Sequence, residues 1–341
     1  MRRCQIFYYP QETNVELGPT NVFPGSQYYN HEPDAEVGEE TPFCGAAGSV
    51  TVVHYALWHR RSEKIGEGHR FMYKFLFTRM EEPTAPAWDC NDLSWLDADD
   101  RRNSMWKTMW EWSAGGNGSS TQGAAGGDVA ELVERLEDAN ETTSFQAAYS
   151  LAAMGGQAVP ELITRLSSDN EDLRRNAGYS LAAIGRAAVP ALEEAAGADR
   201  VETRAVAVDA LGNMGRPAAA ASGTLQTALK DENGDVRMYA ARALGNVGDA
   251  AAAAVPSLID ALADAEDWVV RDSLLALAKL GPDAAEAAPR LDRYLRHESR
   301  YVRAKAALAL QRIGTEEATD TLIKHLNTAR WCPLTNKDSQ Y

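Results

Sequence analysis

Histidine and cysteine, the usual metal ligands and nucleophiles, are few and scattered in this chain of 341 residues, which holds six His and four Cys. No CxxC pair occurs, so we expect reduced, isolated thiols rather than a disulfide framework or a zinc site at Cys4, Cys44, Cys90 and Cys332. His54 and His59 lie five residues apart on the strand predicted for residues 49–58, which would direct their side chains to opposite faces. These two histidines could therefore not share one metal ion.

The charge balance disfavours several classes of partner. The formal net charge is −15 and the isoelectric point is about 4.9, which argues against nucleic acid or an anionic membrane surface. The first residues run into a polar and aromatic stretch without the apolar core of a signal peptide, and no run of about 18 apolar residues occurs. We therefore expect a cytoplasmic protein whose partner is another protein, with no nucleic acid and no membrane bound.

The composition changes sharply near residue 114. Six of the eight tryptophans precede residue 128, and residues 114–127 form a Gly- and Ser-rich stretch that is typical of a flexible linker. A chain of this length predicts about two domains. We therefore divide the chain into a first domain at residues 1–113, the linker, a second domain at residues 128–327 and a tail at residues 328–341.

The second domain repeats one helix ending, Leu-x-x-apolar-Gly, six times. The glycines are spaced 30, 30, 33, 33 and 33 residues apart, at Gly155, Gly185, Gly215, Gly248, Gly281 and Gly314. Each glycine is predicted to close a helix in the left-handed conformation, and a proline such as Pro160 or Pro256 often opens the next helix. Helix pairs of this length without strand signals predict an all-α solenoid of six pairs and a last helix around residues 319–326.

The pattern from Asp231 to Gly245, with Val236-Arg237 inside it, resembles HEAT repeats of the short kind found in bilin-lyase-like proteins. Related pieces are Leu173-Arg174 and Val302-Arg303, whereas Val270-Arg271 lies one residue nearer its glycine. The resemblance covers residues 128–327. It implies a HEAT-like scaffold that binds a protein partner and does no chemistry by itself.

The recurring arginines of these repeats allow two interpretations. They are Arg174, Arg204, Arg237 and Arg303. They could form an anion-binding stripe, or a ladder of Arg–Asp pairs between neighbouring repeats with loop acids such as Asp169 or Asp235. We favour the ladder, because fixed spacing follows from repetition itself. Deoxyhypusine hydroxylases, which are also HEAT solenoids, build a di-iron site from several His-Glu pairs, but this domain has the single pair His297-Glu298, which we expect in a solvated turn.

The first domain is rich in short aromatic and β-branched runs, which predict strands at residues 5–9, 19–23, 49–58 and 71–79. Residues 88–112 hold five tryptophans. Within them a helical spacing predicts a short amphipathic helix through Met105, Trp106, Met109 and Trp110. This helix could act as a substrate lid, but we favour packing over one face of the sheet.

Two stretches of this domain resemble the phytanoyl-CoA dioxygenase family: residues 9–30, with Pro24-Gly25-Ser26, and residues 48–61, followed by Arg70. The resemblance covers about residues 4–80 and implies a jelly roll, or double-stranded β-helix, that uses non-haem Fe(II) and 2-oxoglutarate. It assigns His59 as the late histidine of the iron-binding triad and Arg70 as the clamp for the distal carboxylate of 2-oxoglutarate. His69 is expected at the surface.

The family's His-x-Asp motif, which supplies the other two iron ligands, would lie upstream of residues 5–10 and is missing from this chain. Gln27 replaces the His that usually follows Pro-Gly-Ser, and His31 and Asp34 lie in the wrong strand order to replace the motif. The sequence therefore predicts a partial jelly roll from a longer oxygenase that acts on a small or acyl-type substrate, with this chain alone inactive. The alternative is a purely non-catalytic HEAT-repeat scaffold with a remnant β domain.

Overall fold

The computed structural model describes residues 2–27, 29–31, 39–82, 84–85, 94, 103–113 and 128–328. The chain divides into two compact units, Met1–Met80 and Glu81–Tyr341, which are treated separately below. Several predictions lie outside the described residues: the linker at 114–127, the tail beyond 328, Asp34, Cys90 and Cys332. None of the helices in the described ranges is long and apolar enough to cross a bilayer.

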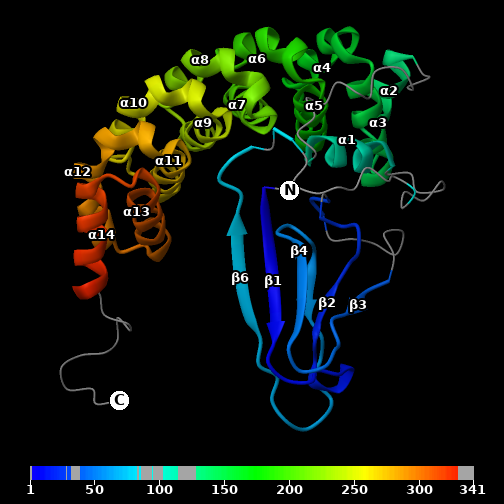
Figure 1. The fold of residues 1–341 in the computed structure, drawn as a ribbon. Helices are drawn as coiled ribbons and strands as arrows, with labels where there is room; N and C mark the ends of the chain where they lie inside the picture. The colour runs from blue at the N-terminus through cyan, green and yellow to red at the C-terminus, as the bar shows by residue number, and fades with distance from the viewer. Residues whose placement is uncertain are drawn as a thin grey trace. The chain divides into compact units, whose positions relative to one another are not determined.

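The described part of the first unit contains two small antiparallel sheets (Figure 1). One has the order β4-β1-β6 and consists of β1 (Arg3–Tyr9), β4 (Ser49–His54) and β6 (Tyr73–Thr78). The other has the order β3-β2-β5 and consists of β2 (Thr20–Val22), β3 (Thr41–Pro42) and β5 (His59–Arg61). Strands were expected here from the sequence, but as a partial jelly roll; the described strands form two small antiparallel sheets and show no jelly roll.

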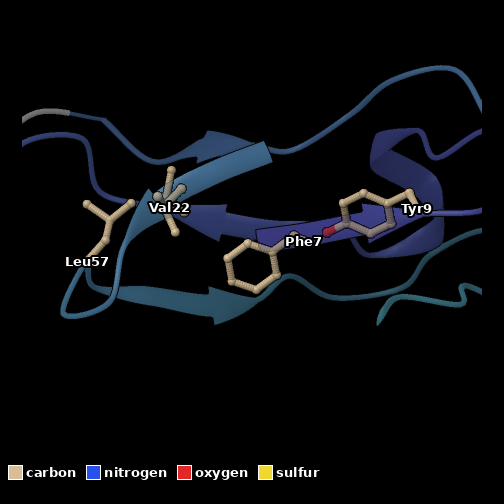
Figure 2. Close-up of a cluster of buried hydrophobic side chains, with 5 residues drawn as sticks. Phe7, Tyr9, Val22 and Leu57 are labelled. Carbon is tan, nitrogen blue, oxygen red and sulfur yellow. The ribbon is translucent and has the colours of Figure 1, made fainter. Parts of the chain in front are cut away.

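The core of this unit lies between the two sheets. It consists of Phe7, Tyr9, Val22, Val53 and Leu57 (Figure 2). Phe7 and Tyr9 are two residues apart on β1, so both side chains point to the same face, where each is 1% exposed. The Tyr9 hydroxyl donates to Thr20 Oγ1 at 3.0 Å, which satisfies the polar end of a fully buried side chain.

The strand predicted for residues 49–58 is wrong in its second half. β4 ends at His54, and the chain then crosses to the other sheet, where β5 begins at His59. The backbone N–H of Leu57 donates to the carbonyl of His54 at 3.1 Å, which closes the turn, and the buried Leu57 side chain anchors it in the core. The two histidines therefore lie on different sheets rather than on one strand.

The second unit is a helical solenoid, as predicted. Its long helices are α3 (Glu141–Ala153), α5 (Glu171–Ile184), α7 (Val201–Met214), α9 (Gly234–Val247), α11 (Asp267–Leu280) and α13 (Arg300–Ile313). The others are α2 (Val129–Arg135), α4 (Val159–Arg165), α6 (Val189–Ala195), α8 (Ser222–Ala228), α10 (Val255–Ala261), α12 (Ala288–Leu291) and α14 (Glu316–Thr328). In Figure 1 the inner side of the curved array is formed by the long helices α5, α7, α9, α11 and α13, and its outer side by the short helices α4, α6, α8 and α10.

The helix predicted from the tryptophan-rich stripe is α1 (Asn103–Ser113). It contacts α3, the first long helix of the solenoid, and Trp106 and Trp110 are partly buried. Within its own unit, α1 therefore packs against the solenoid, and the packing over one face of the sheet stays a prediction.

Each long helix is followed by a glycine with positive φ, between 58° and 76°, as the sequence predicted. The expected left-handed helical conformation holds at Gly314, where ψ is 11°. At Gly185, Gly215, Gly248 and Gly281, however, ψ lies between −126° and −144°. This combination of angles is open almost exclusively to glycine, so a side chain would be strained there.

The 30- and 33-residue spacings differ in the 3₁₀ turn that follows the glycine. This turn has four residues at Gly155–Ala158 and Gly185–Ala188, but seven at Gly248–Ala254 and Gly281–Ala287. The helices on either side keep their length: α5, α7, α9, α11 and α13 have 14 residues, and α4, α6, α8 and α10 have seven. The three additional residues therefore lie in the connecting turn.

Small residues let the long helices stack closely. A Cβ placed on Gly212 of α7 would lie 2.8 Å from the Cβ of Ala243 in α9. A Cβ on Gly245 of α9 would lie 2.9 Å from the Cα of Ala276 in α11. Both distances are far below van der Waals contact, so these two interfaces exclude any side chain at the glycines.

The Arg–Asp ladder is present in two repeats. Arg204 donates from Nε and Nη2 to the carboxylate of Asp231 at 2.7 and 3.0 Å, and Arg237 donates in the same way to Asp264 at 2.6 and 3.0 Å. In each case the acid lies in the loop of the next repeat, 27 residues on. The hydrogen bond from Arg237 lowers the pKa of Asp264.

Neither of the acids predicted for this ladder pairs through its carboxylate with one of the four recurring arginines. Asp169 pairs with Arg200 at 2.8 Å, and Asp235 is exposed in the first turn of α9. Arg174 donates to backbone carbonyls of its own loop, including that of Asp169 at 3.0 Å. The loop position equivalent to Asp231 in the repeat after Arg174 is Ala198, which offers no carboxylate.

Candidate functional site

His59 and Arg70, the residues singled out in the first unit, both approach strand β2. His59 is paired with Val22 across β5 and β2, and Arg70 donates from Nη1 to Thr20 Oγ1 at 3.1 Å. Thr20 and Val22 are two residues apart on the strand, so their buried side chains share one face. The structure thus brings both residues to the same face of β2, between the sheets.

Both ring nitrogens of His59 have partners. Nδ1 lies 2.7 Å from the carbonyl oxygen of Leu57, and Nε2 lies 3.2 Å from the ammonium nitrogen of Lys74. Because an ammonium group can only donate, Nε2 must accept and Nδ1 must carry the proton. The lone pair that would bind a metal is therefore directed at a cation.

The donor set around His59 does not fit the iron centre implied by the resemblance. Within the described ranges, no group of three or more His, Cys, Asp or Glu side chains is arranged to hold a metal ion. His31 is exposed, and Nδ1 of His54 accepts from the backbone N–H of Ala56 at 3.1 Å on the other sheet. In the solenoid, His297 lies in an inter-helix loop and stacks on Tyr294.

A buried acid in the solenoid, Asp272, ties α9 to α11. It is 1% exposed, and its Oδ2 accepts from Nε and Nη2 of Arg242 at 3.1 and 2.9 Å. Its Oδ1 accepts from Nε of Arg271 at 3.0 Å. Burial by itself lowers the pKa of Arg242, but the charges of Asp272 and Asp209 outweigh burial, and the pKa is raised. The Arg242 guanidinium therefore stays charged in spite of its burial.

Two large aromatic side chains, Trp268 and Tyr301, are 55% and 56% exposed on the solenoid. They are the second residues of α11 and α13, so they occupy the same position in successive repeats. The preceding repeats carry polar or acidic residues at this position: Thr142, Asp172, Glu202 and Asp235. Because repetition does not require aromatic residues here, the pair is a local departure from the pattern of the array.

A guanidinium group lies over each of these rings. Arg271 is 3.9 Å from the centroid of the Trp268 ring, and Arg300 is 4.8 Å from that of Tyr301. Arg300 also hydrogen-bonds the Tyr301 hydroxyl at 2.8 Å, and this bond, with the charge of Arg300, lowers the pKa of Tyr301. We call Trp268, Arg271, Arg300 and Tyr301 the basic-aromatic surface.

The stretch that contains Arg300 and Tyr301 has a charge opposite to that of the chain, whereas residues 264–272, around Trp268 and Arg271, contain four Asp or Glu and one Arg. Residues 290–312 contain seven Lys or Arg and two Asp or Glu, a net charge of +5 in a chain of −15. Arg290, Arg293, Arg296 and Arg300 in this stretch are exposed. The sequence analysis did not identify the surface, although aligning the repeats on their glycines would have placed its two aromatic residues in one column.

Comparisons with known proteins concern the solenoid. A family profile described as HEAT repeats matches residues 129–202, 189–278 and 273–332, which together span more than half of the chain. A search of curated proteins gives no match. Among similar solved structures, an engineered protein is 24% identical over 55% of this chain and 99% of its own, with a TM-score of 0.41. A designed armadillo repeat protein is 19% identical over 55% and 100%, with a TM-score of 0.39. Escherichia coli YibA is 20% identical over 58% and 76%, with a TM-score of 0.44.

Proposed function

Because the chain belongs to the HEAT-repeat family, we propose that it is a non-catalytic scaffold that binds an acidic segment of a protein partner on its basic-aromatic surface. The observation that carries this proposal is the exposure of Trp268 and Tyr301 at equivalent positions, each beneath a guanidinium. Trp, Tyr and Arg are the residues that contribute most to binding energy at protein interfaces. The charge of +5 over residues 290–312, the stretch that contains Arg300 and Tyr301, favours an acidic segment, and the overall charge of −15 disfavours a long polyanion such as nucleic acid.

For the first unit we propose a structural role for His59 and Arg70, with neither Fe(II) nor 2-oxoglutarate bound by this chain. The contact from Lys74 to His59 and the hydrogen bond from Arg70 to Thr20 support this role. Both side chains thereby link the loop and strand segments that enclose the core between the sheets.

The scaffold proposal is tested by fluorescence anisotropy with a short labelled peptide rich in Glu and Phe, beside a Lys- and Phe-rich peptide of equal length. We expect the acidic peptide to bind and its affinity to fall with salt. Arg300→Glu should weaken binding about tenfold or more, because it reverses an exposed charge beside Tyr301. Arg186→Glu, an exposed charge reversal in a repeat without aromatic residues at this position, is the matched control.

Equal affinity of the two peptides would overturn the proposal, as would equal losses in the two variants. Tighter binding of a single-stranded RNA oligonucleotide than of the acidic peptide would overturn the choice of a protein partner. The double variant Trp268→Ala/Tyr301→Ala checks the contribution of the two aromatic side chains. It should lose more affinity for the acidic peptide than either single variant.

A further inference from the structure

One face of the β4-β1-β6 sheet is apolar and exposed. The register places Ile6 of β1 opposite Val52 of β4 and Phe75 of β6, and residues paired in this way point to the same side of a sheet. Alternation along the neighbouring strands continues this side. We call its apolar part the outer face, formed by Ile6, Val50, Val52, Tyr73, Phe75 and Phe77. The register also places Cys4, Tyr8 and His54 on this side of the sheet.

The opposite side of the same sheet contains Phe7 and Tyr9 and already forms the core of the unit. The sheet is therefore apolar on both sides, whereas an antiparallel sheet with one solvated side normally alternates apolar with polar residues. On the outer face, the valines of β4 and the aromatic residues of β6 are 48–61% exposed. None of the six residues that form the outer face carries a charge.

The area left open is large for a monomer. Side chains of these sizes at these exposures present about 600 Å² of contiguous apolar surface, the upper end of what monomers usually leave open. Two such faces packed together would bury about 1,200 Å² in total, which reaches the lower end of the range for specific interfaces. An uncharged apolar face is also complementary to itself, since no like charges would be opposed.

We propose that two copies of this chain associate by packing their outer faces together around a two-fold axis, as two aligned sheets about 10 Å apart. The alternative for a second copy is pairing along an edge strand. β6 is an edge strand of this sheet, so its outer backbone groups offer such a template (Figure 1). Face packing and edge pairing use different side chains, which makes them separable.

Two adjacent residues of β6 provide a matched pair. Phe75 lies on the outer face and is 48% exposed, while Leu76 points to the other side and is 55% exposed. We expect the full chain to sediment at twice its 37.1 kDa mass at micromolar concentration in analytical ultracentrifugation. Phe75→Lys should weaken association about 100-fold, because each dimer would bury two ammonium groups, and Leu76→Lys should leave it unchanged.

Val52→Lys places the same charge on the outer face from β4 and should weaken association similarly. If the circular dichroism spectrum of Phe75→Lys shows that this variant does not fold, Val52→Lys tests the outer face in its place. A wild-type chain that stays monomeric over the whole concentration range would overturn the proposal. Equal weakening by Leu76→Lys and Phe75→Lys would overturn it as well, in favour of edge pairing.

Discussion

Gly212 allows a direct test of how tightly α7 and α9 are packed. In the variant Gly212→Ala, the new Cβ would meet the Cβ of Ala243 at 2.8 Å and its Cα at 3.0 Å. Alanine favours a helix interior over glycine by about 1 kcal/mol, but overpacking against backbone typically costs about 1–3 kcal/mol. The backbone of Ala243 cannot move aside without shifting α9. We therefore expect a net loss of up to about 2 kcal/mol in the free energy of unfolding.

The matched control is Gly223→Ala in α8, where an added Cβ has no heavy atom within 4 Å. This variant should be more stable than the wild type by about 0.5–1 kcal/mol, because alanine restricts the unfolded chain. Urea unfolding followed by circular dichroism gives both differences from the midpoints, provided that the slope is unchanged. A Gly212→Ala variant that is more stable than the wild type, as Gly223→Ala is expected to be, would refute the close packing inferred for this interface.

Three further predictions concern charges and ligands. Asp272→Ala removes the acceptor of two arginines, so it should lower the free energy of unfolding, measured in urea, by about 2–3 kcal/mol. Asp292→Ala, which removes an exposed ion pair, is the control and should lower it by less than about 0.5 kcal/mol. Similar losses in the two variants would contradict the buried cluster. Burial lowers the pKa of His54 to about 4, so the free energy of unfolding should fall by about 1–2 kcal/mol as the pH drops from 6.5 to about 4. A urea midpoint that does not change with pH, or the same pH dependence in His54→Gln, would contradict this prediction. Anaerobic titration should give no stoichiometric Fe(II) binding and no succinate from 2-oxoglutarate; iron binding abolished by His59→Ala would contradict the role assigned to this residue.

The solenoid could be predicted because its signals are local and recur. Each Leu-x-x-apolar-Gly ending fixes a helix terminus within a few residues, and positive φ at the glycine follows from sterics alone. The break after His54 could not be predicted in this way. Residues 49–58 contain neither Gly nor Pro, and the crossing between sheets is decided by the burial of Leu57 in a core assembled from distant strands.

For the candidate surface, the sequence contained one clue whose meaning required the structure. The ladder arginines Arg204 and Arg237 are the fourth residues of their helices, whereas the fourth residue of α11 is the buried Val270. Arg271 is therefore shifted by one residue from the ladder position. The shifted guanidinium instead reaches the buried Asp272 and covers the ring of Trp268. Spacing alone shows that the fifth repeat departs from the others, but not which ring and which acid the displaced arginine contacts.

The 3₁₀ turns after the helix-closing glycines have a consequence for how such an array can evolve. Since four-residue and seven-residue turns connect helices of the same length, units of either kind present equivalent faces to their neighbours. Recombination between genes can therefore add, delete or exchange whole units without redesigning the contacts at each new junction. The same turns are natural insertion points for an engineered loop, because this chain already tolerates a change in length there.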